Sequence, residues 1–445
     1  MLRISQGAEN ERIKIMENKK FFGYKAAIGA FLVIFVNMGV ASTLGVFIAQ
    51  LAEFSGWSLS ACVIIGTINT ILNALLSLVA IPLAKKIGYR WMMLISIIAV
   101  ALHVNMYCFA VPGQVLSTLI FFYIGGGLAS VAIAFGTNAI CSGLIAEWFM
   151  GAHDREKVTG AVTAGAGFGA AIWVFLAGQL FQYYTWQQCY RIITVIALVI
   201  GIGAVLFLIR TPGKIGQSPK PASAEEKGAA SDTEELAGVT HKQALKSGSF
   251  WLLMAAIVCS VTACSAIISY AAAYWQGLGM SPTASSNYTA AYLVIAAASL
   301  LVCGFLFKKI RSTGYTLLTS ICMIACMILF IIWGRNTNNF VLILIVITAG
   351  ICYPIDAAFP GMVANDIFGP KEVALIIGNL VTACYIGQLL SSLVTSALLA
   401  TSGGFTTLWT VFAIVSVAGM VLTLIAIGMS PMRKQEKLLK QNQNS

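Results

Sequence analysis

Long apolar stretches dominate this sequence, and they restrict the fold more than any other feature. There are twelve such stretches, and polar residues, glycine or proline separate them. A helix needs roughly 20 apolar residues to cross a bilayer, and each stretch is about that long or longer. They span 24–50, 58–84, 91–110, 116–146, 158–181, 188–210, 249–274, 283–307, 314–333, 340–365, 373–400 and 405–429.

The composition excludes a soluble domain. Hydrophobic residues make up 59% of the chain and charged residues only 10%, whereas a soluble domain carries about 25% charged residues. The stretches are too long for membrane-spanning strands and lack the alternation of polar and apolar residues that such strands show. The sequence therefore predicts an all-α membrane protein with twelve transmembrane helices.

One long polar run divides the stretches into two sets of six. It covers 211–248 and contains the helix-breaking residues Pro212, Pro219 and Pro221. Such a segment buries too little apolar surface to order itself, so a flexible, solvated linker is predicted. The predicted order is N-terminal tail, first six-helix half, linker, second six-helix half and C-terminal tail, at 1–23, 24–210, 211–248, 249–429 and 430–445.

The basic residues are distributed unevenly over the loops. An even number of spans places both tails on one side, and all 27 lysines and arginines except Arg191 and Arg335 fall on that side. Basic loops stay cytoplasmic during insertion, so both termini and the linker are predicted to face the cytoplasm from the plasma membrane. The net charge of +11 then reflects topology and anionic lipid headgroups, and no nucleic-acid partner is expected.

Two short motifs recur at the same place in each half. Leu83-Ala-Lys-Lys-Ile after the second stretch recurs as Leu306-Phe-Lys-Lys-Ile after the eighth, 223 positions later. The end of the fourth stretch, from Gly143, recurs in the tenth from Gly361, 218 positions later. These echoes favour duplicated six-helix units, an arrangement found in membrane transporters.

The turn after the second stretch makes the chain resemble the major facilitator superfamily, over nearly its whole length. The superfamily signature is Gly-x-x-x-Asp-Arg/Lys-x-Gly-x-Arg. Lys86, Gly88 and Arg90 match it, whereas Ile81 and Lys85 replace the glycine and the aspartate. The resemblance implies two pseudo-repeated six-helix bundles in a monomer, and the missing aspartate removes the usual charge partner of the gate between them.

Charged residues at the helix ends are predicted to form that gate. Glu147 and Asp366 end the fourth and tenth stretches, close in sequence to basic residues. With the residues that match the signature, they are expected to form an ion network away from the substrate. The predicted gate residues are Lys86, Gly88, Arg90, Glu147, Arg155, Asp366 and Lys371.

Three further motifs resemble the branch that contains oxalate/formate antiporters and monocarboxylate porters. Relatives that carry such anions have basic residues inside spans eight and eleven, but 283–307 and 373–400 contain none. This departure favours a substrate that is neutral or accompanied by a proton. The three motifs are Gly56-Trp57-Ser58, the run from Trp148-Phe149 through Arg155 and Gly160 to Gly169, and Ala244 to Trp251.

Asp356 is the main candidate for the substrate site. It lies deep in the tenth stretch between Pro354 and Pro360, and by the 218-residue offset it corresponds to Asn138. A carboxylate buried in a membrane needs a partner or a proton, which favours proton coupling or substrate contact. A purely structural hydrogen bond is the alternative.

Other polar side chains within the stretches are candidates for the same site. The resemblance implies that spans one, four, seven and ten line the cavity. Each candidate also has an alternative role in helix packing, and His103 is interpreted as a packing group rather than a proton relay. The remaining candidates for substrate binding or proton coupling are Asn37, Tyr270, Tyr274, Tyr353, Tyr292, Tyr385 and Gln388.

The sequence predicts a secondary active transporter that works by alternating access, moving a mono- or dicarboxylate by proton symport or exchange. The alternatives are a facilitator or exporter of a neutral or amphipathic molecule and a transporter-like membrane sensor. No phosphate-binding loop of the Gly-x-x-x-x-Gly-Lys-Ser/Thr type is present, so ATP is not expected as the energy source. Catalytic and metal-ligand motifs are also missing from the sequence, so no enzyme activity, metal or cofactor is expected.

Overall fold

The computed structural model describes residues 21–109, 111, 115–150, 152–220, 238–335, 337–369 and 371–432. Helices make up nearly all of the regular structure in these residues. They are α2 (Gly23–Ser42), α3 (Leu44–Ser55), α4 (Leu59–Ile87), α5 (Tyr89–Tyr107), α6 (Val115–Gly136), α7 (Asn138–Trp148), α8 (Ala152–Leu180), α9 (Trp186–Phe207), α10 (Pro212–Ile215), α12 (His241–Leu245), α13 (Gly248–Gly277), α14 (Pro282–Arg335), α15 (Asn339–Cys352), α16 (Pro354–Ala357), α17 (Phe359–Phe368), α18 (Val373–Leu399) and α19 (Gly404–Gly428).

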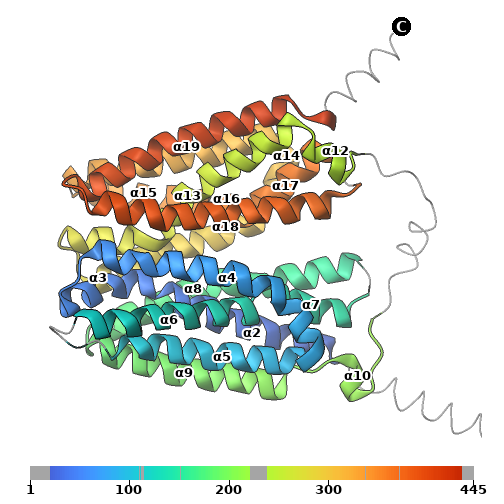
Figure 1. Ribbon diagram of the computed structural model, residues 1–445, viewed down its shortest axis with the longest axis horizontal. Helices are drawn as coiled ribbons and strands as arrows, with labels where there is room; N and C mark the ends of the chain where they lie inside the picture. The colour runs from blue at the N-terminus through green and yellow to red at the C-terminus, as the bar shows by residue number, and fades with distance from the viewer. Residues whose placement is uncertain are drawn as a thin grey trace, which may run out of the picture.

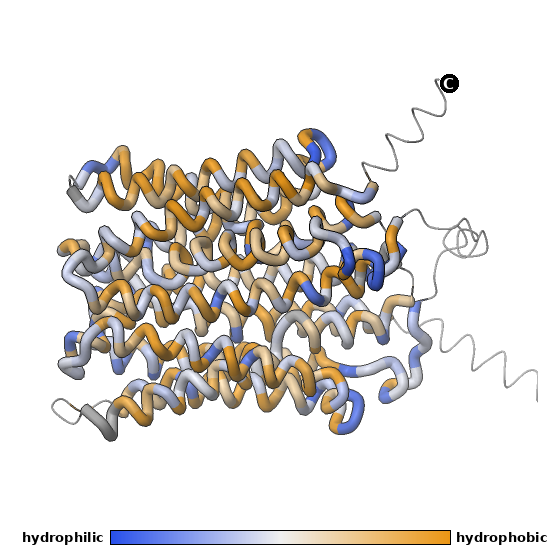
Figure 2. The backbone as a smooth tube through the Cα atoms, turned by 45° about the horizontal axis from the view of Figure 1, so that its top comes forward, coloured by the Kyte–Doolittle hydropathy of each residue, from blue (hydrophilic) through white to orange (hydrophobic). Residues whose placement is uncertain are grey.

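The long helices form two bundles that lie side by side. Figure 1 shows α2 to α9 in one bundle and α13 to α19 in the other, hereafter the N-terminal and C-terminal halves. The short helices α10 and α12 lie at one common end. Lys85, Arg90 and Arg210 line one cavity with Lys214 of α10, and Lys246 directly follows α12, so we call this the basic end. Figure 2 shows that apolar residues predominate along the helices, as burial in lipid requires.

The prediction of an all-α membrane fold is confirmed. The described residues contain 11 helices long and apolar enough to cross a membrane. One of them, Pro282–Gly334, is 53 residues long and includes the eighth and ninth predicted spans. The break expected between these two spans is reduced to Arg311, where the backbone leaves the helical conformation.

Arg311 occupies the same position in its half as Gly88 does in the first, 223 residues earlier. Gly88 has φ 92° and ψ 144° between α4 and α5, and Arg311 has φ 56° and ψ −179°. The duplicated turns therefore share a positive φ angle, although only the first has the residue that adopts it without steric cost. A side chain in this backbone region costs roughly 1–3 kcal/mol.

Replacing Arg311 with glycine should therefore stabilise the protein. We expect a gain of about 1 kcal/mol in the free energy of unfolding, because glycine removes the strain at the turn. Thermal unfolding of the detergent-solubilised protein measures the change. Arg311→Ala is the matched control, since it removes the charge and keeps a Cβ. An equal gain in both variants would assign the effect to charge and contradict the strain.

The fourth and tenth spans are both interrupted at equivalent places. The fourth divides into α6 and α7 at Thr137, where ψ is −147°. The tenth divides into α15, α16 and α17, because Pro354 and Pro360 lack the N–H group that a continuous helix needs. The 218-residue offset relates Thr137 to Ile355. Such interruptions free backbone groups, and in membrane proteins they occur where a helix lines a cavity or packs against protein.

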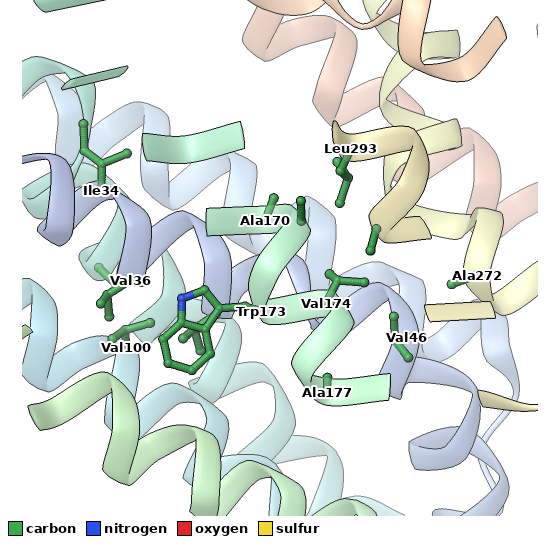
Figure 3. Packing of buried hydrophobic residues seen from close by; sticks show 14 of the residues in the cluster. Ile34, Val36, Val46, Val100, Ala170, Trp173, Val174, Ala177, Ala272 and Leu293 are labelled. Carbon is green, nitrogen blue, oxygen red and sulfur yellow. The ribbon is translucent and has the colours of Figure 1, made fainter. Parts of the chain in front are cut away.

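The core of the N-terminal half depends on close contact between α2 and α8. A Cβ atom on Gly169 would lie 2.4 Å from the carbonyl oxygen of Phe35, and one on Gly39 would lie 2.1 Å from the Trp173 ring. Small residues permit this approach in membrane helices. Figure 3 shows Trp173 and Val174 of α8 within the buried hydrophobic cluster that fills this region.

Both ends of the predicted linker contact the bundles. Lys220 exchanges backbone hydrogen bonds with Trp148 and Met150 at the end of α7. At the other end, the backbone N–H of His241 donates to the Glu372 carboxylate at 2.6 Å. Short helices α10 and α12 thus occupy parts of 211–248 that were predicted to be flexible, because these bonds to residues distant in sequence hold both ends and a capping box at Thr240 begins α12. Residues 221–237 lie outside the described chain.

Candidate functional site

A cavity of about 270 Å³ lies between the two halves; we call it the central cavity. The N-terminal half contributes residues from α2 to α6, and the C-terminal half contributes residues from α13, α14, α16 and α18. Its polar lining residues are Ser42, Asn69, Thr70, His103, Tyr107, Ser265, Ser269, Tyr270, Thr289, Tyr292, Asp356, Gln388, Ser391 and Ser392.

Asp356 and Gln388 form a hydrogen-bonded pair in the wall of the central cavity. The Gln388 amide Nε2 donates to both carboxylate oxygens of Asp356, at 3.2 and 3.3 Å. Asp356 is partly buried and lies on α16, about midway along the bundle in Figure 1. The interruption of the tenth span therefore places a carboxylate at the cavity, where a neighbouring amide orients it.

The cavity has little charge with which to bind an ion. Among the described residues that line it, Asp356 is the one with a formal charge, and lysine and arginine do not occur. The neutral polar groups include Tyr270, whose hydroxyl donates to Ser392 Oγ at 3.4 Å. The hydroxyl of Ser265 and that of Ser391 are buried without a hydrogen-bond partner in the described chain.

His103 lies on the N-terminal side of the cavity. Its side chain is 1% exposed, and Nδ1 is 3.3 Å from the Tyr107 hydroxyl. The other ring nitrogen, Nε2, has no hydrogen-bond partner among the described residues. The sequence alone favoured a packing role for this residue. Its place in the cavity wall adds a polar group on the half opposite Asp356.

Sequence reasoning did not single out the polar residues of α4. Gly66, Asn69 and Thr70 line the cavity from one helix face, because they are spaced at i, i+3 and i+4. Gly66 permits close contact between α4 and the C-terminal half, since a Cβ atom on Gly66 would lie 2.4 Å from Ser392 Oγ. The available signal in the sequence was this set of small and polar residues at i, i+3 and i+4.

Several predicted site residues lie elsewhere. Asn37 is fully buried and donates to Ser96 Oγ at 3.0 Å. The Tyr274 hydroxyl donates to the carbonyl oxygen of Phe330 at 2.7 Å. Both side chains therefore join helices within one half, and neither lines the central cavity.

Three other tyrosines and Asn138 were also predicted to lie at the site. Tyr292 lines the cavity, but its hydroxyl donates to the Ile268 carbonyl at 3.1 Å. Tyr353 and Tyr385 are partly buried and are not among the lining residues. Asn138 begins α7, and its side chain lies outside the described part of the structure. The predicted residues that meet at the cavity are thus Asp356, Gln388, Tyr270 and Tyr292.

Hydrogen bonds join the two halves at the end opposite the basic end. Gln50 Nε2 donates to Gln276 Oε1 at 2.7 Å, between α3 and α13. Ser396 of α18 donates to the Ser60 carbonyl at 2.9 Å. A third contact links Gln179 of α8 to α14. These bonds hold the halves together there, so we call this the closed end.

The predicted gate residues separate into two groups at the basic end. Lys86, Gly88, Arg90 and Glu147 line one cavity of the N-terminal half. Arg155 is exposed, as is Lys371. Asp366 belongs to the C-terminal half, where it accepts a hydrogen bond from the Ser312 hydroxyl.

The side chains that commonly bind metals do not gather in the described part of the chain. No group of three or more histidine, cysteine, aspartate or glutamate residues there could hold a metal ion. The central cavity is lined by residues with hydroxyl, amide, imidazole and carboxylate groups, which suit the binding of a small solute by hydrogen bonds.

Comparisons with known proteins agree with this architecture. The model of the Major Facilitator Superfamily matches residues 30–360 and 276–443. Two crystal structures of a bacterial homologue of the human lysosomal transporter Spinster are similar in fold. The inward-facing, unoccupied form has a TM-score of 0.63 at 17% identity, over 95% of this chain and 99% of that one. The inward-facing, occupied form has a TM-score of 0.59 at 16% identity, over 94% and 98%. No curated protein matches the chain significantly.

Proposed function

Because the chain belongs to the Major Facilitator Superfamily, we propose that it is a secondary active transporter that moves a small organic solute by alternating access. In this mechanism the two halves move about the central cavity and expose it to one side of the membrane at a time. The hydrogen bonds at the closed end support a state in which the halves separate toward the basic end.

The Asp356–Gln388 pair is the observation that carries the proposed mechanism. Asp356 lies at the cavity between the halves, at a break in the tenth span. A membrane-embedded carboxylate is costly when it is charged and unpaired, and a proton removes that cost. Asp356 therefore takes up a proton together with the solute or in exchange for it, and Gln388 orients the carboxyl group in both states.

The lining restricts the charge of the solute. A monocarboxylate fits when Asp356 is protonated, because the carboxyl group and the Gln388 amide then both donate hydrogen bonds. A dicarboxylate would bring a second negative charge into a cavity without lysine or arginine among its described lining residues, at a cost of several kcal/mol. We therefore favour a monocarboxylate moved with a proton. A neutral or amphipathic solute is the second candidate, which the largely uncharged lining supports.

The proposal includes the orientation of the protein in the membrane and the energy source of transport. The basic end faces the cytoplasm of a plasma membrane, because lysine and arginine stay on that side during insertion. Both termini and the 211–248 segment are then cytoplasmic, and the halves 24–210 and 249–429 carry six spans each. The monomer uses a proton gradient or solute exchange rather than ATP.

Exchange of labelled solutes tests the class of cargo. Liposomes that contain the purified protein are preloaded with unlabelled lactate, oxalate or glycerol, and entry of the same labelled compound is measured. We expect lactate to exchange and oxalate to exchange at least about tenfold more slowly, since a second uncompensated charge costs more than 1.4 kcal/mol. Glycerol exchange without lactate exchange would favour the neutral cargo, and rapid oxalate exchange would contradict the proposed charge limit.

A further inference from the structure

A second cavity lies at the basic end of the N-terminal half, apart from the central cavity. It has a volume of about 520 Å³ and lies where α4, α7 and α9 end and α5 and α10 begin. All of these helices except α10 belong to candidate membrane spans; their ends place the cavity at the level of the membrane surface. We call it the basic cavity because its charged lining residues are Lys85, Lys86, Arg90, Arg210, Lys214 and Glu147.

The charge of the basic cavity is unbalanced. Five cationic residues and one acidic residue are among the described residues that line it. The cations come from two chain segments that are more than a hundred residues apart. Like charges gathered at one place repel one another, and a bound anion relieves that repulsion. The cavity therefore has the charge and the room to hold a polyanionic group.

Local contacts fix the position of two of these cations. The Arg90 guanidinium donates to the carbonyl oxygen of Leu206 at 2.9 Å, which holds it against the last turn of α9. Lys214 of α10 reaches the turn between α4 and α5, where its Nζ would lie 3.8 Å from a Cβ on Gly88. The folding of α10 onto the turn thus brings the cations together.

We propose that the basic cavity binds a phosphate group, supplied either by an anionic lipid headgroup or by a soluble phosphate compound. Lysine and arginine are the side chains that recognise phosphate, because their N–H groups form charge-assisted hydrogen bonds with its oxygens. Cavities between helix ends at the membrane surface are accessible to both sources. Occupation of the cavity would fasten α10 to the α4–α5 turn, and with it the beginning of the linker.

Thermal unfolding of the full-length protein in detergent tests this proposal. The unfolding midpoint is followed by tryptophan fluorescence during titration with short-chain phosphatidylglycerol, inorganic phosphate or short-chain phosphatidylcholine. The variant is Lys86→Gln with Lys214→Gln. The matched control is Lys308→Gln with Lys309→Gln, at the equivalent turn of the C-terminal half. All four lysines are exposed, so both variants are expected to fold.

We expect a saturable rise of the midpoint in the unsubstituted protein. The half-saturating concentration should increase at least about tenfold in Lys86→Gln with Lys214→Gln, because two charge-assisted contacts are lost, and stay unchanged in the control. A rise with phosphatidylglycerol alone assigns a lipid headgroup, and an equal rise with inorganic phosphate assigns a soluble source. No rise with either compound, or equal weakening in both double variants, would overturn the proposal. Transport is not the readout, so the result is independent of the proposed cargo.

Discussion

Proton-driven accumulation is expected to disappear in Asp356→Asn, whereas solute exchange continues. A gradient of about one pH unit supplies about 1.4 kcal/mol per proton, which sustains about tenfold accumulation of a solute moved with one proton. Asparagine cannot release a proton but resembles the protonated carboxyl group in size and keeps a hydrogen-bond donor toward the cavity. The accumulation ratio in liposomes should therefore fall from about ten to one.

The matched control for this experiment is Glu53→Gln. Glu53 is an exposed acidic residue of α3 outside the central cavity, and its substitution removes a carboxylate from the same membrane protein. It should leave accumulation unchanged. If Asp356→Asn accumulates solute as well as the unsubstituted protein, Asp356 does not carry the proton. If exchange is also lost, the side chain is required for solute binding itself, and proton coupling must be assigned by other means.

A covalent link between Gln50 and Gln276 is expected to stop transport almost completely. Their side-chain amides are 2.7 Å apart across the two halves, so cysteines at both positions are within reach of a short thiol-specific linker. Linking them prevents the closed end from opening, which alternating access requires in every cycle. Exchange by Gln50→Cys with Gln276→Cys should fall to background after linking and recover when the linker is cleaved by reduction.

Two controls separate this effect from chemical damage. The chain has 11 native cysteines, so the unsubstituted protein treated with the same linker measures reaction at those sites. Asn105→Cys with Thr194→Cys links α5 to α9 within one half, at a side-chain contact of 2.9 Å, and should leave exchange intact. Full exchange by the linked Gln50→Cys and Gln276→Cys protein would show that the halves do not separate at this end.

The length of the apolar stretches was sufficient to predict the fold class and most of the helices, because crossing a bilayer requires long apolar segments. The turn at Arg311 was predicted too long, since two lysines and an arginine indicate an exposed loop but also fit on the end of a continuous helix. The order of α10 and α12 was also missed. It depends on hydrogen bonds to residues distant in sequence, such as the one between His241 and Glu372, which a local pattern does not contain.

The sequence indicated less of the candidate site. Asp356 stood out because a carboxylate deep in an apolar stretch between prolines is costly and rare, but its partner Gln388 was one of several equivalent polar residues. Asn37 and Tyr274 are polar residues within apolar stretches, as the cavity residues are. The hydrogen bonds of each are nevertheless made within one half. Which face of a helix meets the cavity depends on packing between helices. A membrane helix is apolar on all sides, so the periodicity of its sequence does not indicate that face.

Net uptake of labelled lactate by liposomes that contain the purified protein tests coupled transport most directly. The measurement compares uptake with an imposed proton gradient and after the gradient is collapsed by an ionophore. We expect saturable lactate accumulation that follows the gradient and disappears in Asp356→Asn. Saturable uptake of glycerol in its place would retain transport and change the cargo. Uptake of both solutes at the rate of protein-free liposomes, under every gradient, would contradict the account of a proton-coupled transporter built around the central cavity.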